Sequence, residues 1–400
     1  MHDARLQSSF HARGPTRMLM WALDHQTAGL LPHTIDQRRK HAVGLEAHCH
    51  VDQVVGFNTA AQRVSQREQR LDIASSQRAR QRMKEQKVFT PPTREDTTIE
   101  DSKGHAEVNR SWHEEYRDLV ARFAAGQLSR FVGDSPAPWT DLSSRKSRKE
   151  VKAFTPEFER LKYFKRIMQG QSNLITKARS FVEKQAEIDA LDLERYDPSI
   201  TPTQMQNLVS EIKKRCASLN DGLCKAPVKI RNVFYLRSDD YYAFYMPTGP
   251  LMMWDRRNYE PLKASPDEFH LPREVTLLDF QAKPPDTLPL TENQSMYWDM
   301  ITSCLYSPRG FHNLKYLDSI APGAYESLVP KIGEFRDARE GGRYDVDMLR
   351  VRLLTPKMLW RLALEWDHWL FKPDIYEMAG SFETHVDTER KVASRYIMPV

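Results

Sequence analysis

The sequence predicts an α/β fold that is enlarged by a charged helical insertion and followed by a helical C-terminal domain. Residues 18–23 (MLMWAL) form a short apolar run, which is typical of a strand buried on both faces in a parallel sheet. Apolar residues recur at helical spacing from 155 to 222, whereas residues 228–246 and 275–280 have the pattern of strands. These changes of period place strands on both sides of a helical segment.

Composition and charge restrict the class of protein. With 400 residues, 40% of them hydrophobic and 10% aromatic, the chain can form two or three folded domains. No apolar run is long enough to span a bilayer, and four scattered cysteines favour a reducing compartment over a disulfide scaffold. A net charge of +5 permits binding to polyanions without requiring it.

The N-terminal region is predicted to form a strand followed by a helix. The strand is the apolar run 18–23, and Thr34 can cap a helix that runs toward Gly56. The strongly basic stretch 63–94 is expected to form a solvated helix that ends at a pair of prolines. Polar linkers are expected on either side of a further helix at 112–123.

Two helices of the insertion have strong start signals. Thr155 and Thr201 each precede a proline, and a glutamine three residues after Thr201 completes a capping box. Gly170 and Ser172 are expected to interrupt the first of these helices, and Gly222 is expected to close the second. The segment between 90 and 225 is therefore predicted to be elongated, charged and helical.

The last third of the chain is predicted to contain strands and then helices. Residues 228–236 and 241–246 are expected to pair as a hairpin whose turn is Ser238-Asp239-Asp240. Residues 275–280 form a further strand, which should share one sheet with 18–23 and 228–236. Beyond residue 285, apolar stripes at helical spacing predict a small helical domain, in which Thr355 caps the last helix.

Motifs for catalysis or metal binding are weak. Asp239 and Asp240 could act as paired carboxylates, but a hairpin tip explains two adjacent aspartates better. His48, Cys49 and His50 are metal-ligand types, yet three adjacent residues do not converge easily on one ion. The sequence contains no glycine-rich phosphate loop and no G-x-S-x-G motif. We predict no catalytic and no metal-binding residue.

Basic residues are concentrated in three segments that could bind phosphates by releasing condensed counterions. The alternative is an ordinary solvated helix face with interspersed glutamate and glutamine. The three segments contain Arg63, Arg67, Arg70, Arg78, Arg80, Arg82, Lys84 and Lys87; Arg145, Lys146, Arg148, Lys149 and Lys152; and Lys162, Lys165 and Arg166.

A tryptophan beside two arginines marks a loop of a different kind. Trp254, Arg256 and Arg257 follow the turn residues of 247–250, so an exposed loop could offer both base stacking and phosphate contacts. The alternative is that an arginine packs on Trp254 to close the loop. The predicted nucleic-acid-binding residues are Arg78, Arg80, Arg82, Lys84, Trp254, Arg256 and Arg257.

Several segments, in order along the chain, resemble fungal mitochondrial transcription factor B, a family related to the rRNA adenine N(6)-dimethyltransferases. The first part of the likeness is 14–21 (GPTRMLMW), 30–32, and Arg38 to Glu46, followed by 54–56. The segments 67–72 and 82–84 continue it. Residues 250–269 resemble the final strands of the family's catalytic domain, and 317–324 and 354–359 resemble its helical C-terminal domain.

The resemblance implies a partial Rossmann-like methyltransferase domain, because two family motifs are missing. Neither the glycine-rich loop that holds S-adenosylmethionine nor the Asn-Leu/Pro-Pro-Tyr-type motif that grips a flipped adenine occurs here. S-adenosylmethionine is therefore implied by resemblance only, and we expect this chain to bind it weakly or not at all. A sheet without its first half should expose an apolar edge.

The predicted organisation has four parts: 1–62, a partial methyltransferase-like segment; 63–225, the charged insertion; 226–285, the closing strands; and 286–400, the helical domain. By resemblance, the protein is mitochondrial, binds DNA or RNA non-specifically, does not enter membranes and assists mitochondrial RNA polymerase. The alternatives are an S-adenosylmethionine-dependent rRNA adenine N(6)-methyltransferase, truncated here, and an inactive RNA-binding or ribosome-assembly protein.

Overall fold

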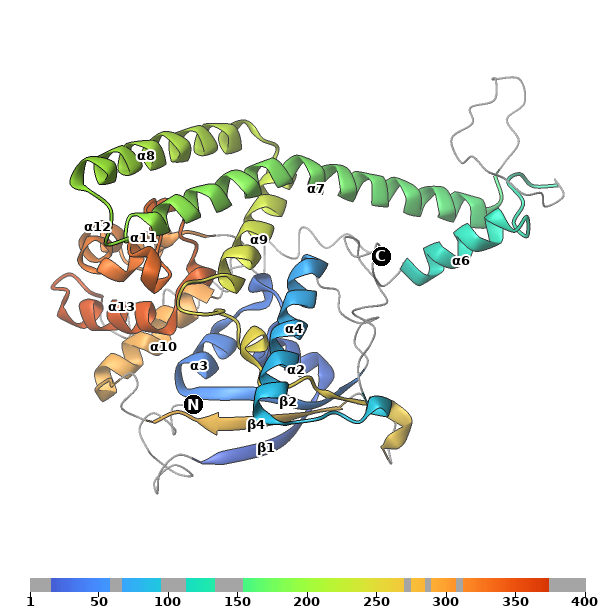
Figure 1. The fold of residues 1–400 in the computed structure, drawn as a ribbon, viewed down its shortest axis with the longest axis horizontal. Coiled ribbons are helices and arrows are strands. Elements are labelled where there is room, and N and C mark those ends of the chain that lie inside the picture. Colours follow the sequence, from blue (N-terminus) through green and yellow to red (C-terminus); the bar gives the residue numbers. More distant parts are fainter. Residues whose placement is uncertain are drawn as a thin grey trace.

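A small sheet lies at one end of the molecule, and helices are stacked above one of its faces (Figure 1). The computed structural model describes residues 16–57, 67–94, 113–133, 154–269, 275–284, 289–306 and 312–373. The mixed α/β class predicted from the sequence is confirmed. Within these residues, no helix combines the length and apolarity that crossing a bilayer requires.

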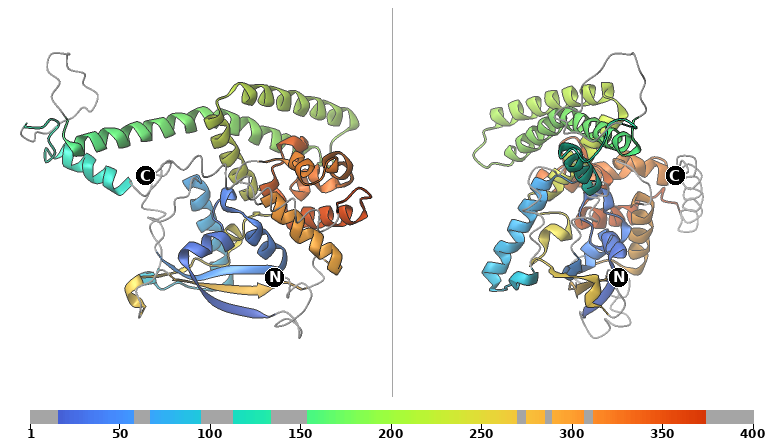
Figure 2. Two further views of the ribbon diagram at one scale, coloured as in Figure 1. Left: turned by 180° about the vertical axis from the view of Figure 1, so that it is seen from behind. Right: turned by 90° about the vertical axis from the view of Figure 1, so that its right-hand side faces the viewer.

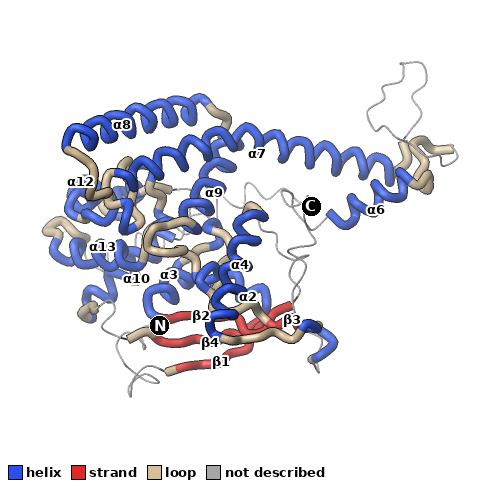
Figure 3. The backbone as a smooth tube through the Cα atoms, viewed as in Figure 1, coloured by secondary structure: helices blue, strands red, loops and turns tan. Residues whose placement is uncertain are grey.

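The sheet has four strands in the order β1-β4-β2-β3 (Figure 3). Their bounds are β1 (Arg17–Leu23), β2 (Cys49–Phe57), β3 (Leu262–Ala264) and β4 (Val275–Ala282). β4 runs antiparallel to both β1 and β2, and β3 runs parallel to β2. The last strand therefore lies between two earlier strands that share one direction. The prediction that 18–23 and 275–280 belong to one sheet is confirmed.

The predicted hairpin at 228–246 is wrong. These residues form one helix, α9 (Val228–Phe244), and Asp239 and Asp240 lie within its last turns rather than at a turn between strands. The sequence pattern did not indicate a helix, because α9 is surrounded by other elements and side chains around most of its circumference are buried. A helix that is buried on most sides, with polar as well as apolar residues inside, lacks the 3.6-residue period that distinguishes a helix from a strand.

β1 is an exposed edge strand and not the strand buried on both faces that we predicted. Met18, Leu19, Met20 and Trp21 are 42%, 63%, 46% and 52% exposed. β4 covers one edge of β1, and no other strand of the described residues covers the second. The exposed apolar edge expected of an incomplete sheet is therefore present, and such an edge favours self-association.

Replacing Leu19 with lysine is expected to reduce self-association of the protein, because a charge on an edge strand opposes pairing with another strand. The change should alter the free energy of unfolding by less than about 0.5 kcal/mol, since the side chain is already exposed. Light scattering against protein concentration measures the effect. Phe89→Lys is the matched control, because Phe89 is exposed outside any strand. Equal improvement in both variants would contradict a specific role of β1.

The helix predicted to run from Thr34 toward Gly56 is shorter than expected. After the short α2 (Asp24–Leu30), α3 (Lys40–His48) ends at His48, and the chain enters β2 at Cys49. The β-branched residues of β2 favour a strand, and pairing with β4 supplies the hydrogen bonds of its backbone.

The insertion is helical, as predicted, and its caps are confirmed. Its helices are α4 (Gln69–Gln86), α6 (His113–Ala124), α7 (Pro156–Glu194) and α8 (Pro202–Lys225). Thr155 accepts a hydrogen bond from the Phe158 amide, and Thr201 forms the expected capping box with Gln204. The expected interruption at Gly170 is wrong, because one interior glycine costs a helix only about 1 kcal/mol. The predicted end at Gly222 is early by three residues.

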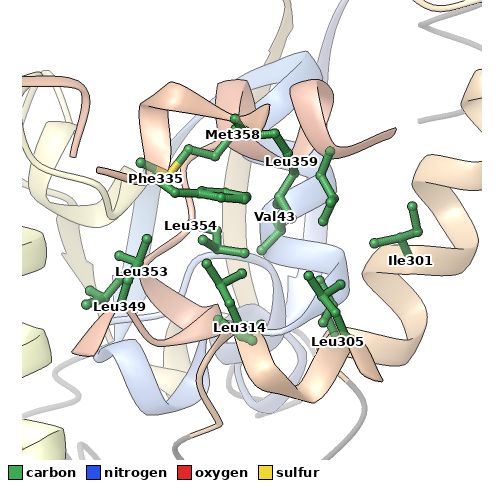
Figure 4. Packing of buried hydrophobic residues seen from close by; sticks show 14 of the residues in the cluster. Val43, Ile301, Leu305, Leu314, Phe335, Leu349, Leu353, Leu354, Met358 and Leu359 are labelled. Atoms are coloured by element: carbon green, nitrogen blue, oxygen red, sulfur yellow. The ribbon is translucent and has the colours of Figure 1, made fainter. Parts of the chain in front are cut away.

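The largest core joins the C-terminal helices to the N-terminal region. The C-terminal helices are α10 (Glu292–Tyr306), α11 (Leu317–Ile320), α12 (Ala324–Leu328) and α13 (Pro356–His368), and Thr355 caps α13 as predicted. Figure 4 shows Val43 of α3 among leucines and Met358 of this region. The core draws on the first, third and fourth predicted parts of the chain, and it unites the segments 317–324 and 354–359 of the family resemblance.

Candidate nucleic-acid interface

Arg78 and Arg82 lie on the side of α4 that faces the body of the protein. The Arg78 guanidinium is 4.1 Å from the centroid of the Phe244 ring and donates a hydrogen bond to the Phe244 carbonyl oxygen at 3.3 Å. Arg82 donates to the carbonyl oxygens of Asp255 at 3.3 Å and Arg257 at 2.7 Å. Two of the predicted phosphate ligands therefore also attach α4 to its neighbours.

These two arginines are only partly buried, and carbonyl groups rather than carboxylates hold them. Neither makes an ion pair within the part of the chain that the structure describes. Burial lowers the pKa of Arg82, and the charges of Arg257 and Arg78 lower it further. Arginine nevertheless stays protonated near neutral pH. The junction between α4 and residues 253–257 therefore carries positive charge, and a bound anion would be stabilised there.

The outer surface of α4 is less basic than the amino-acid sequence of the helix suggests. Lys84 and Lys87 are exposed, Arg80 is half-buried, and Arg70 is paired with Glu68. Gln77, Gln81 and Glu85 share this surface, which is typical of an ordinary solvated face. Arg63 and the basic cluster at 145–152 lie outside the described residues.

The Trp254 loop is buried, so the expectation of an exposed stacking loop is wrong. Trp254 is 2% exposed; the His33 ring stacks on it at 3.8 Å, and the Arg257 guanidinium lies 4.1 Å from its centroid. Arg257 is fully buried and paired with Glu260 at 2.7 Å. The alternative in which an arginine packs on Trp254 to close the loop is therefore confirmed.

Arg256 also points into the protein and donates to the Leu251 carbonyl oxygen at 3.2 Å. Burial lowers its pKa, with a further decrease from the Arg38 charge. The loop packs inward because its short 3-10 turn, Met253–Arg256, lies against α4 and β2. Sequence pattern does not distinguish this arrangement from an exposed loop, because both need an aromatic residue beside arginine.

A buried ionic network, which the sequence did not reveal, connects this loop to α9. Arg67 donates to both carboxylate oxygens of Asp255, at 3.0 and 2.9 Å, and to the His33 carbonyl oxygen at 2.8 Å. Asp240 accepts a hydrogen bond from the Ile35 amide at 2.7 Å. Asp239 is paired with Arg350 inside the protein. The two aspartates thus have separate structural partners and do not act as one carboxylate pair.

Asp240→Asn is expected to remove part of the pH dependence of stability. Burial raises the pKa of Asp240 from 3.8 to about 7, although Arg67 opposes the shift. Between about pH 4 and 7 the folded state therefore holds a proton that the unfolded state has released. This group lowers the free energy of unfolding as pH rises through that window, by at most about 1.4 kcal/mol per pH unit.

Urea unfolding of wild type and Asp240→Asn at several pH values measures this contribution. The asparagine keeps the acceptor for the Ile35 amide but does not titrate. The stability of the variant relative to wild type should rise from pH 4 to 7 and stay constant above it. Parallel curves for the two proteins would contradict the prediction.

The histidines around Cys49 do not form a metal centre in this structure. His50 lies 3.2 Å from the Asp52 carboxylate and 3.0 Å from the Asn258 side-chain nitrogen. Across the described ranges, no group of three or more histidine, cysteine or carboxylate side chains is placed to hold a metal ion.

Similarity to known proteins does not supply a function. No protein-family model, no curated protein and no solved structure matches this chain, so its function has to be inferred from its own residues and contacts.

Proposed function

We propose that the protein binds nucleic acid non-specifically through phosphate contacts, in the manner of mitochondrial transcription factor B, and assists mitochondrial RNA polymerase. The observation that carries the proposal is the positive charge on α4, where carbonyl groups hold Arg78 and Arg82 and no carboxylate pairs with either of them in the described structure. Guanidinium groups in this state can neutralise phosphates and so release the counterions that are condensed on the nucleic acid.

The arrangement of the sheet supports the family likeness. The resemblance segments 14–21 and 54–56 contribute to β1 and β2, and the final strand β4 returns antiparallel between them. The first segments of the likeness and the predicted closing strand thus belong to one sheet, as the resemblance implies. We therefore propose a partial methyltransferase-like domain and a mitochondrial location for the protein.

The residues present do not fit S-adenosylmethionine. β1 leads directly into α2 at Asp24 without a glycine turn, and Ser265 follows β3. No described strand is followed by the glycine-rich turn that would admit an adenosyl group. We therefore propose that this chain does not transfer methyl groups. The rRNA adenine N(6)-methyltransferase alternative predicts that it does, and a methyl transfer assay distinguishes the two.

Three measurements on the full chain test the proposed function. Fluorescence anisotropy compares melted promoter DNA with structured rRNA, and a preference for melted DNA is expected. Incubation with labelled S-adenosylmethionine and rRNA is expected to transfer no methyl group. Addition of the protein to mitochondrial RNA polymerase should increase transcription from a promoter. Preference for structured rRNA would favour the ribosome-assembly alternative, and methyl transfer would favour the enzyme.

Replacing Arg78, Arg80 and Arg82 together with alanine should weaken the salt dependence of binding. Each lost phosphate contact changes the slope of log affinity against log salt by about 0.7 on single strands and about 0.9 on duplex. The triple variant is therefore expected to have a slope flatter by about two to three units, with similar loss of affinity for unrelated sequences. Circular dichroism checks that α4 remains folded. An unchanged slope in a folded variant would leave α4 without a binding role.

A further inference from the structure

We propose a second phosphate-binding surface, which rests on the proposed function, along the exposed side of α7 between residues 162 and 184. The stretch has six cationic residues and one carboxylate, Glu183, so its excess of positive charge equals the net charge of the whole chain, +5. The cations are Lys162, Lys165, Arg166, Lys177, Arg179 and Lys184. Six of the seven cations of α7 thus lie in this stretch, whereas six of the seven carboxylates of the helix lie outside it.

α7 leaves this stretch open to solvent because it connects two separate small cores. Phe158, Leu161 and Phe164 pack with α6 at the outer end of α7, whereas Ala178 and Val182 pack with α8 and α9. Between Phe164 and Ile175 no residue of α7 is buried. Figure 2 shows the outer half of α7 projecting from the body with α6 at its end. Approach to this part of the helix is therefore unobstructed by the described elements.

The exposed cations are aligned along the helix. Residues spaced by three and four positions lie on one side of a helix. Such a line, exposed throughout and without a carboxylate, consists of Tyr163, Arg166, Gly170, Asn173, Lys177, Ser180 and Lys184. With a rise of about 1.5 Å per residue it extends over about 31 Å.

The charges on this line are not neutralised by the part of the chain that the structure describes. Arg166, Lys177 and Lys184 have no carboxylate partner among the residues that the structure describes. On the same projecting arm, by contrast, Arg122 is paired with Glu157 at 2.8 Å and Arg160 is paired with Glu115. Unpaired cations are available to neutralise phosphates, and the release of the cations condensed on the nucleic acid then favours binding.

The residues between the cations favour a nucleic-acid backbone over an acidic protein. Gly170 has open space around its Cα, so a strand can approach the helix backbone closely. Asn173 and Ser180 can donate to phosphate oxygens without reading bases. Tyr163, which is 57% exposed, can stack on a base at the end of the line. Tight protein interfaces instead depend on a cluster of buried anchors, and Tyr163 is the single aromatic residue on this exposed line.

The test is the triple variant Arg166→Gln, Lys177→Gln, Lys184→Gln in the full chain. Binding to labelled single-stranded DNA and to duplex DNA is measured by anisotropy between about 50 and 200 mM salt. The slope of log affinity against log salt should flatten by about two units on single strands and up to about three on duplex. Loss of affinity should be similar for unrelated sequences, and helicity by circular dichroism should be unchanged.

The matched control is Arg122→Gln, Arg160→Gln, Arg215→Gln, which removes the same charge from arginines that are paired with carboxylates. It should change the slope by less than about one unit. Equal effects of the two triple variants, or an unchanged slope in the first, would overturn the α7 surface while nucleic-acid binding by wild type still stands. Failure of wild type to bind either DNA would overturn the proposed function itself. Tighter binding of wild type to polyglutamate than to DNA would replace nucleic acid with an acidic protein.

Discussion

Replacing Glu46 with alanine is expected to lower the free energy of unfolding by about 3–5 kcal/mol, because it leaves the Arg38 guanidinium as an unpaired charge inside the protein. Both side chains are buried, and Arg38 Nε lies 3.0 Å from each Glu46 carboxylate oxygen. Arg38 also donates to the Arg352 carbonyl oxygen at 2.7 Å and to the Tyr306 hydroxyl at 3.1 Å. The pair therefore connects α3 to the C-terminal region.

Urea unfolding measures this loss, and two further variants make it specific. Glu157→Ala breaks an exposed ion pair with Arg122 and should cost at most about 1 kcal/mol. Arg38→Met combined with Glu46→Leu removes both charges and should be more stable than Glu46→Ala alone, since buried ion pairs can be replaced by apolar residues. A double variant as unstable as Glu46→Ala would contradict the explanation by an uncompensated charge.

Sequence predicted the elements whose signals are local. Thr155, Thr201 and Thr355 cap their helices within four residues, and each helix begins where these residues place it. The strand at 275–280 was also predicted, because a short apolar run is itself the signal of a strand that lies between neighbours in a sheet. α9 could not be predicted in this way, because its helical conformation depends on packing against α7 and the C-terminal core.

The sequence identified the basic residues of the candidate site, but it did not predict which way their side chains face. Arg78 and Arg82 have the same sequence signal as Lys84, yet the first two face the body of the protein and Lys84 faces solvent. Orientation depends on residues that are distant in sequence, such as Phe244 and Asp255. The partners of Arg67 were hidden for the same reason, since Asp255 lies 188 residues away along the chain.

β1 illustrates an ambiguity that composition alone cannot resolve. An apolar run such as 18–23 indicates a buried strand, but it does not indicate whether other elements of the described chain cover that strand. The exposed fractions of Met18, Leu19, Met20 and Trp21 show that these elements do not cover it. Two neighbouring strands would be needed to make β1 central, and the sheet of the described residues provides β4 alone.

Replacing Trp254 with alanine is expected to cost about 3–5 kcal/mol of unfolding free energy, which is typical of deleting a buried tryptophan. The loss should lie in the upper part of this range, because His33 and Arg257 both lose the ring that they contact. Trp21→Ala is the control, because the same substitution at a residue that is 52% exposed should cost about 1 kcal/mol or less.

Nucleic-acid binding by Trp254→Ala separates packing from recognition. If Trp254 only closes the loop, molecules that remain folded should bind with the wild-type affinity and the wild-type salt slope. If Trp254 stacks on a base, the molecules that remain folded should bind with lower affinity and an unchanged salt slope, because stacking is not screened by salt. The 2% exposure of the ring favours the first result, and the second would require the loop to open when nucleic acid binds.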